Sequence, residues 1–213
     1  MSQSHNIPMK KVAIVDYGMG NVDSVARAVQ HCGGEPVITY KTADFEVANY
    51  IILPGVGAFE TGMKNIRTHG LEAVLREQVL EKGVPFLGIC LGMQLLATKG
   101  WEGGETEGLG WIEGEIKRLV PDSSGSRIPH VGWNDVIFNQ PSSVFQNIPS
   151  GKDFYFVHSY HFSCNHPQDE IAHTPYCGGF VSVVNRNNIL GVQFHPEKSQ
   201  RLGLQVIKNF LSL

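Results

Sequence analysis

Residues 84–96 read Val-Pro-Phe-Leu-Gly-Ile-Cys-Leu-Gly-Met-Gln-Leu-Leu, and they are the strongest guide to the fold of the whole chain. An apolar run of strand length leads into an apolar segment typical of the first turns of a helix. Cys90 lies at the junction, with a glycine two residues to either side. This Gly-x-Cys-x-Gly pattern is the thiol form of the nucleophile elbow, a sharp strand-to-helix turn that holds its side chain above the sheet edge. Glycines flank such a turn because a Cβ atom would clash there.

A cysteine in such an elbow sits at a helix N-terminus. The helix dipole and the free backbone N–H groups favour the thiolate, which is the nucleophilic form. The alternative is a small buried cysteine in a tight turn, since free cysteine is among the most buried residue types. The chain has only 4 cysteines in 213 residues, too few for a disulfide scaffold, so we expect reduced thiols.

Composition is typical of a globular α/β protein. With 42% hydrophobic and 17% charged residues, the chain can bury a sizeable core, and we expect a single domain over residues 1–213 with a flexible tail at 1–9. The formal net charge is -3 and the basic residues are scattered, which argues against a nucleic-acid partner. No run approaches the roughly 18 apolar residues of a membrane span, and the first residues are polar, so we expect no membrane contact and a cytoplasmic protein.

Strand-like and helix-like patterns alternate through the N-terminal half. Apolar runs at 11–16, 36–39 and 50–53 predict strands. Apolar residues at helical spacing predict helices over 22–29 and 63–79. This alternation predicts a mostly parallel central sheet flanked by helices, with a ligand site at the carboxyl ends of the strands.

Two glycines after the first strand resemble part of a dinucleotide-binding fingerprint. Gly18 and Gly20 have the right spacing, but Asp23 occupies the third glycine position. An aspartate at a helix start would repel a pyrophosphate. We therefore expect no cofactor.

The pattern changes after Gly100. Short strand-like runs separated by Pro, Gly, Asn and Ser predict an antiparallel or mixed sheet added to the first one, with strands at 112–119, 136–138, 154–157 and 180–184. A last strand at 189–194 and an amphipathic helix over 202–211 close the chain. The expected fold has three layers, a sheet between two sets of helices.

The segment His195-Pro196-Glu197 follows the last predicted strand. Proline disfavours the helical region for the residue before it, and in an extended chain residues two apart point to the same side. An imidazole and a carboxylate that project together are what a nucleophilic cysteine needs, namely a base and a group that orients the base. The alternative is a solvent-facing turn that caps the final helix.

Attack of a thiolate on a carbonyl also requires donors for the developing oxyanion. The backbone N–H of Leu91 is one candidate, since it follows the nucleophile directly. The segment Gly55-Val56-Gly57 after the third strand is another, because its N–H groups are unencumbered. A plain Pro-Gly turn is the alternative for this segment.

Four side chains crowd together like a metal site, namely His158, His161, Cys164 and His166. On an extended strand, however, His161 points away from His158 and Cys164. We therefore expect no metal.

Five segments in order along the chain together resemble the class I glutamine amidotransferases: 54–57 (PGVG), 88–94 (GICLGMQ), 129–134 (PHVGWN), 156–160 (FVHSY) and 191–197 (GVQFHPE). The third and fourth segments resemble, more narrowly, the glutaminase subunits of imidazole glycerol phosphate synthases. The resemblance runs from about Val12 to Leu213 without a missing block, and it implies the three-layer, flavodoxin-like fold of that class.

The resemblance implies a catalytic triad of Cys90 as nucleophile, His195 as general base and acid, and Glu197 as the orienting carboxylate. It also implies that L-glutamine is the substrate, hydrolysed through a γ-glutamyl thioester to glutamate and ammonia. The implied oxyanion donors are Gly57 and Leu91. Residues implied to bind the substrate are Gly55, Gln94, Glu102, Ser159 and Tyr160.

By the same resemblance, ammonia passes to a (βα)₈ barrel cyclase subunit bound as a heterodimer, which makes imidazole glycerol phosphate and aminoimidazole carboxamide ribotide. Asn21, His130 and Trp133 are implied to lie at that interface. One alternative keeps the chemistry but places the chain with a sugar amidotransferase of surface-polysaccharide biosynthesis. Two others are a stand-alone cysteine hydrolase and an interaction protein that has lost its chemistry.

Overall fold

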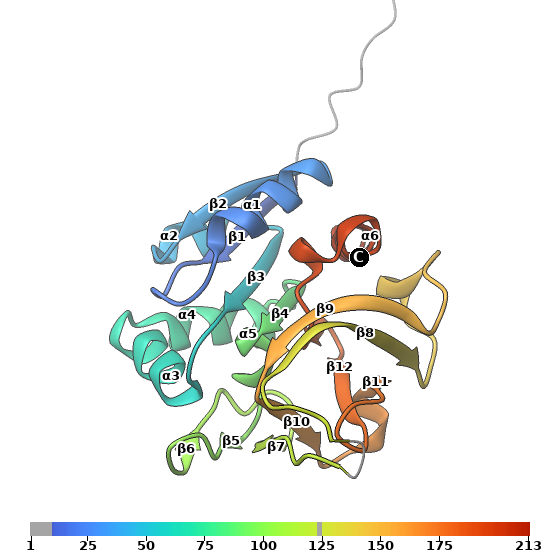
Figure 1. Ribbon diagram of the computed structural model, residues 1–213. Coiled ribbons are helices and arrows are strands. Elements are labelled where there is room, and N and C mark those ends of the chain that lie inside the picture. The colour runs from blue at the N-terminus through green and yellow to red at the C-terminus, as the bar shows by residue number, and fades with distance from the viewer. Residues whose placement is uncertain (1–9, 123–124) are drawn as a thin grey trace, which may run out of the picture.

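Parallel strands form the first half of the central sheet (Figure 1). The computed structural model describes residues 10–122 and 125–213, and the tail predicted at 1–9 lies outside them. The strands lie in the order β2-β1-β3-β4, as the alternating pattern predicts. Their bounds are β1 Lys10–Val15, β2 Gly34–Thr39, β3 Tyr50–Gly55 and β4 Phe86–Cys90. The helices between them are α1 Val22–His31, α2 Thr42–Glu46, α3 Phe59–Thr68 and α4 Leu71–Arg76, followed by a π-helical turn at Glu77–Glu81.

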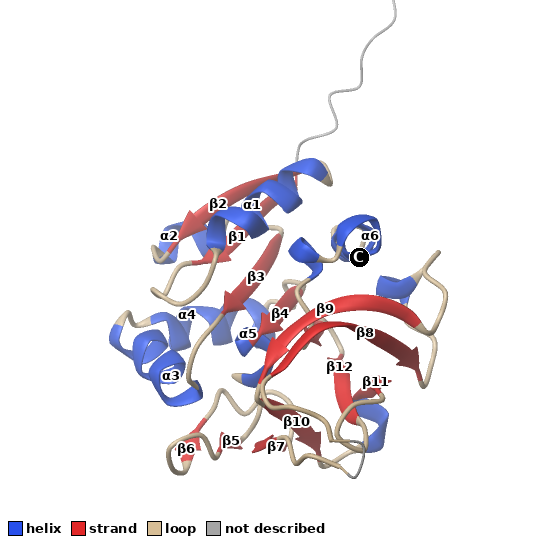
Figure 2. Ribbon diagram, in the orientation of Figure 1, coloured by secondary structure: helices blue, strands red, loops and turns tan. Residues whose placement is uncertain are grey.

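Side chains of β1 point alternately to the two faces of the sheet, and the core lies in two parts, one on each face. Val12 and Ile14 face the cluster that includes residues of α1 and of α6 (Gln200–Phe210), whereas Ala13 and Val15 face the cluster that includes residues of α3 and α4. All four side chains are buried, so the sheet is covered on both faces. Figure 2 shows helices on both sides of the strands, which confirms the predicted three-layer arrangement.

The C-terminal half extends this sheet with antiparallel and mixed pairing. Strand β13 pairs in parallel with β4 and antiparallel with β12, and the sheet continues through β10, β7, β5 and β6. With β8, β9 and β11, which lie off this path, it has 13 strands among the described residues. A curved ribbon of β8 and β9 joins it through β11 (Figure 1). The bounds are β5 Lys99–Gly100, β6 Thr106–Glu107, β7 Gly114–Arg118, β8 His130–Phe138, β9 Lys152–His158, β10 Tyr160–Cys164, β11 Glu170–Thr174, β12 Phe180–Arg186 and β13 Ile189–Val192.

Several element boundaries differ from the sequence-based expectations. The strand predicted at 136–138 is the end of a longer strand that begins at His130. Strand β10 lies where the argument about His158, His161 and Cys164 expects an extended chain, whereas β11 was not predicted as a strand. The helix after Cys90 is only a short one, α5 (Leu91–Gln94), after which the chain turns toward β5. Within the described residues no helix is both long and apolar enough to cross a membrane.

Two glycines of the elbow are fixed by close backbone contacts. A Cβ atom on Gly92 would lie 1.7 Å from the Leu53 carbonyl oxygen, and one on Gly88 would lie 2.6 Å from the Gly92 carbonyl oxygen. Neither contact can relax by rotation of a side chain, since both involve backbone atoms of β3, β4 or α5. The elbow and the strand beside it are therefore packed as one unit.

We predict that Gly92→Ala lowers the free energy of unfolding by about 3 kcal/mol, because the added methyl group overpacks against the β3 backbone. Gly70→Ala is the matched control: Gly70 has φ +67 and open space around its Cβ position, so its cost is the left-handed backbone alone, about 1 kcal/mol. Urea unfolding of both variants makes the comparison. Equal losses would show that the elbow is not closely packed.

Candidate active site

Strand register brings three loop segments to one edge of the sheet. Gly55 at the end of β3 pairs with Cys90 at the end of β4, and Val192 at the end of β13 pairs with Ile89. Because these three strands are parallel neighbours, the loops that follow them begin side by side. The sequence prediction that the glycine-rich segment, the thiol and the histidine share one edge is confirmed.

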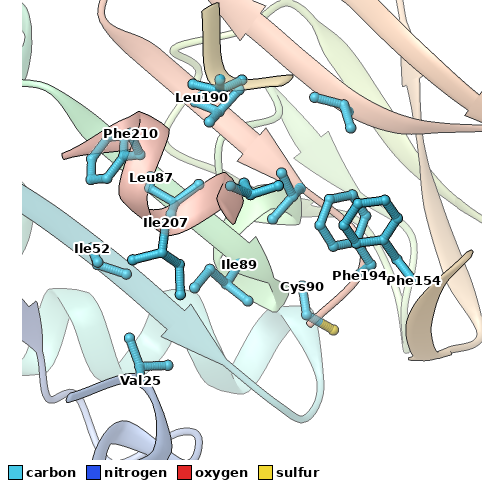
Figure 3. Packing of buried hydrophobic residues seen from close by; sticks show 14 of the residues in the cluster. Val25, Ile52, Leu87, Ile89, Cys90, Phe154, Leu190, Phe194, Ile207 and Phe210 are labelled. Atoms are coloured by element: carbon cyan, nitrogen blue, oxygen red, sulfur yellow. The ribbon is translucent and has the colours of Figure 1, made fainter. Parts of the chain in front are cut away.

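Cys90 has the backbone conformation of a nucleophile elbow. Its φ of 54° and ψ of -108° are rare for a residue with a side chain, and it is the N-cap residue of α5. The first N–H groups of a helix have no partner within the helix, so the N–H of Leu91, the first residue of α5, is available as a donor. Figure 3 shows Cys90 beside Ile89 at the end of β4, among the buried apolar side chains.

His195 and Glu197 are in direct contact. The distance between His195 Nδ1 and Glu197 Oε1 is 2.8 Å, and each side chain is 3% exposed. The His195 backbone is held on both sides, since its N–H donates to the Tyr155 carbonyl at 2.8 Å and its carbonyl accepts from Ser199 Oγ at 2.7 Å. His195 is extended as expected, but Pro196–Lys198 forms a 3₁₀ turn. The expectation of a wholly extended segment was therefore wrong, because proline is also well suited to the first position of such a turn.

Electrostatics couple the imidazole to the thiol. Burial alone would lower the pKa of His195, but the hydrogen bond to Glu197 and the interaction with Cys90 outweigh it and raise that pKa to about 10. The remaining ring nitrogen, Nε2, is buried and forms no regular hydrogen bond to any described residue, so it is free to carry a proton toward the sulfur. An imidazolium that is stable at neutral pH is the partner that a thiolate requires.

A cavity of about 300 Å³ opens in front of Cys90. Its lining combines the predicted oxyanion donors with most of the predicted substrate-binding residues; it comprises Val56, Gly57, Ala58, Cys90, Leu91, Gln94, Glu102, Val157, His158, Ser159 and Tyr160. Gly55 is not in the lining. It lies behind the cavity, where a Cβ atom would meet the Tyr17 hydroxyl at 2.1 Å.

Glu102 is fixed in place rather than free in solvent. Its Oε2 accepts a hydrogen bond of 2.9 Å from the Phe59 N–H, at the start of α3. This contact caps the helix and leaves the carboxylate at the cavity wall. A carboxyl group therefore lines the same cavity as Cys90 and Leu91.

Gln94 is buried, and both of its amide hydrogens are used within the protein. Its Nε2 donates to the Tyr160 carbonyl at 2.9 Å and to Gln193 Oε1 at 3.0 Å. Only its carbonyl oxygen remains to face a ligand. Gln193 was not singled out from the sequence, although its position two residues before His195 in an extended segment was a usable signal.

A second hydrogen-bonded chain runs from the cavity toward the surface. His158 Nδ1 lies 2.8 Å from the Tyr160 carbonyl, His158 Nε2 lies 3.1 Å from His130 Nδ1, and His130 Nε2 lies 3.2 Å from Asn134 Nδ2. A carbonyl only accepts, so His158 donates to it and accepts from His130, which in turn accepts from Asn134. Both rings are therefore neutral.

The acid–base behaviour of the two rings agrees with this assignment. Burial lowers the pKa of His130 to about 4. Burial also lowers the pKa of His158, to about 3. The nearby rings of His130, His161 and His195 lower this pKa further, whereas the hydrogen bond to the Tyr160 carbonyl raises it.

The residues expected at a partner interface differ in exposure. Trp133 is 46% exposed, whereas His130 is 3% exposed and stacks on Tyr176 with ring centroids 4.0 Å apart. Asn21 is exposed and caps α1, since its Oδ1 accepts from the Ser24 N–H at 3.2 Å. His130 can therefore act on a partner only through its surface neighbours.

The three histidines considered as part of a metal site have separate partners, that of His158 being the Tyr160 carbonyl. His161 Nδ1 lies 3.1 Å from the Phe162 carbonyl, and His166 lies 3.1 Å from Glu113 Oε2. Over residues 10–122 and 125–213 no group of three or more His, Cys, Asp or Glu side chains is arranged to hold a metal ion.

The whole chain matches known proteins. The family model for glutamine amidotransferase class-I matches residues 13–212, and the chain belongs to that family. A solved structure entitled crystal structure of glutamine amidotransferase aligns with a TM-score of 0.72 at 20% identity, covering 95% of this chain and 99% of that one. The structure of PurLQS from Thermotoga maritima aligns with a TM-score of 0.66 at 20% identity, covering 96% and 98%. These two likenesses support the class I glutamine amidotransferase fold.

Relatives of higher sequence identity show which group within the family the chain belongs to. The imidazole glycerol phosphate synthase subunit HisH of Moorella thermoacetica is 48% identical, with 95% of this chain and 94% of the relative covered. The subunit HisH of Ruegeria pomeroyi is 44% identical, with 94% and 97% covered. Within the class I family, the chain therefore belongs to the HisH group.

We predict that the free energy of unfolding of the wild-type protein falls more steeply than that of His158→Gln as the pH is lowered from about 6 to about 4. The two slopes should differ by about 1.4 kcal/mol per pH unit. A histidine whose pKa is about 3 in the folded protein and about 6.5 in the unfolded chain takes up its proton only on unfolding in this range, so acid favours the unfolded state. Urea unfolding at several pH values measures both slopes. Parallel slopes would mean that His158 is protonated in the folded protein.

Proposed function

We propose that this chain is the glutaminase subunit of an imidazole glycerol phosphate synthase and acts in histidine biosynthesis. The observation that carries the proposal is the buried contact between His195 and Glu197 beside a thiol in an elbow, where Cys90 and Glu197 together raise the pKa of His195. The names of the HisH relatives support the choice of synthase.

The reaction begins with attack of the Cys90 sulfur on the carbonyl carbon of the glutamine side-chain amide. The carbon–sulfur bond forms as the carbonyl electron pair moves to oxygen. When the tetrahedral intermediate collapses, the carbon–nitrogen bond breaks and His195 gives its proton to the leaving nitrogen, which departs as ammonia. Water, deprotonated by His195, then hydrolyses the thioester and releases glutamate. Glu197 keeps the ring oriented throughout.

Donors for the oxyanion are the backbone N–H groups of Leu91 and Gly57. Both residues line the cavity next to Cys90, and each such donor typically contributes about 10²- to 10³-fold in rate. Gly57 has φ +130, a conformation that favours glycine, so its peptide can adopt the orientation that the oxyanion needs.

The α-ammonium and α-carboxylate groups of glutamine bind to residues of the cavity other than the triad. The Glu102 carboxylate and the Gln94 carbonyl oxygen are acceptors for the α-ammonium group, and Ser159 and Tyr160 offer polar contacts to the α-carboxylate. Gly55 supports the neighbouring loop from behind. A zwitterion held at both charges places its side-chain amide at the sulfur.

Ammonia passes to a cyclase subunit bound as a heterodimer. The exposed Trp133 of β8 and the exposed Asn21 at the start of α1 are the contact residues that we assign to this chain, with His130 as a support behind them. Aromatic residues such as tryptophan are enriched in the energetically dominant positions of protein interfaces.

We predict that Cys90→Ser lowers glutamine-dependent synthesis by the reconstituted synthase about a thousandfold or more, while ammonia-dependent synthesis is unchanged. Only the generation of ammonia passes through the thiol. Cyclase product formation with glutamine and with ammonium salt as nitrogen sources measures both activities.

Cys32→Ser is the matched control for this experiment, since Cys32 lies at the end of α1 with its thiol 3.3 Å from the Leu204 carbonyl. It should leave both activities as in the wild type. Loss of both activities to the same extent in Cys90→Ser would show that Cys90 is structural, and the glutaminase proposal would then fail.

A further inference from the structure

A buried glutamine contacts the nucleophile, and neither the triad nor the substrate-binding set includes it. Gln193 follows β13 and is 0% exposed. Its Nε2 lies 3.6 Å from the Cys90 sulfur, within hydrogen-bond range for sulfur. Its backbone N–H donates to the Ser182 carbonyl at 2.9 Å, so the residue is held at both ends.

The orientation of this amide follows from its neighbours. The Tyr160 carbonyl can only accept, so the Gln94 terminal atom 2.9 Å away is the nitrogen. The second hydrogen of that nitrogen is directed to the Gln193 side chain at 3.0 Å, which must therefore present its oxygen there. Gln193 is left with its NH₂ group facing the sulfur. One backbone carbonyl thus fixes the direction of both amides.

A neutral donor is well suited to this position. A thiolate is stabilised by hydrogen bonds to its charged form, and such charge-assisted bonds are stronger than neutral ones. Because the amide carries no charge, it leaves the proton transfer to His195 undisturbed. Among the described residues, the titratable groups that interact electrostatically with Cys90 are His195, from the segment after β13, and Tyr17, from the segment after β1; the Val157 carbonyl oxygen lies 3.8 Å from the sulfur.

We propose that Gln193 is a further catalytic residue, whose side-chain amide donates a hydrogen bond to the Cys90 thiolate and holds the sulfur in position for attack on the glutamine amide. The inference rests on the proposed function, because it assigns a role at the same nucleophile. It also links the cavity to the sulfur, since Gln94 is a wall of the cavity and orients Gln193.

The test is the rate at which iodoacetamide alkylates Cys90 in the full chain, followed by mass spectrometry of the peptide that contains Cys90. In Gln193→Met, which removes both amide functions, alkylation at neutral pH should be about tenfold slower than in the wild type. The pH at which the rate reaches half its maximum should move upward. Gln193→Glu, which still accepts from Gln94 but cannot donate to the sulfur as a carboxylate, should show the same changes.

Gln78→Met is the matched control, since Gln78 is also a buried glutamine and lies before β4, at the end opposite Cys90. It should leave the alkylation rate and its pH profile unchanged. If a Gln193 variant that folds, as judged by urea unfolding, is alkylated at the wild-type rate with an unmoved profile, Gln193 is structural and the inference is overturned. If Gln193→Met does not fold, Gln193→Glu decides by the same criterion. Absence of Cys90 alkylation in the wild type would instead contradict the proposed function.

Discussion

The strained backbone at Cys90 is the constraint on which the rest of the structure depends. A residue with a side chain is held at φ 54° only because the surrounding chain leaves it no alternative. The short distance from the Gly92 Cβ position to the Leu53 carbonyl oxygen shows how closely the turn packs on β3. The parallel register of β3, β4 and β13 then places the ends of these three strands in one row. The thiol therefore lies between a glycine-rich segment and a histidine without any long loop having to bring them together.

Order in the polar part of the site depends on one carbonyl group. The Tyr160 oxygen accepts from Gln94 and from His158, which uses both of its lone pairs. One chain of donors leads from it through Gln193 to the sulfur, and the other leads through His130 toward the surface around Trp133. Buried networks in which each member is satisfied are rigid. The reacting groups are therefore positioned before a substrate enters, and the imidazoles in the second chain stay neutral while His195 is charged.

Much of this arrangement could be predicted from the sequence. Apolar runs of strand length and apolar residues at helical spacing indicated the parallel half of the sheet, and the glycines around Cys90 indicated the elbow. Boundaries in the second half could not be predicted in the same way, because β10 and β11 are short and half-polar and their pairing is set by distant partners such as β7 and β12. The burial of His130 was missed because a histidine that follows Pro129 and precedes Val131-Gly132 resembles a loop residue, whereas stacking on Tyr176 is a tertiary contact. Gln193 was missed because an amide has no charge or motif to mark it, and only the neighbours around it reveal which way it points.

The central claim is that His195 rests as an imidazolium, held in that form by Cys90 and Glu197. Heteronuclear NMR of the His195 ring nitrogens across a pH titration tests it most directly, with Cys90→Ala as the comparison. The account predicts that the wild-type ring stays protonated until the pH approaches about 10, because Cys90 and Glu197 together raise its pKa to that value. In Cys90→Ala the ring should lose its proton at a clearly lower pH. A wild-type ring that titrates near the ordinary histidine value of about 6.5, and does so identically in the variant, would contradict the account.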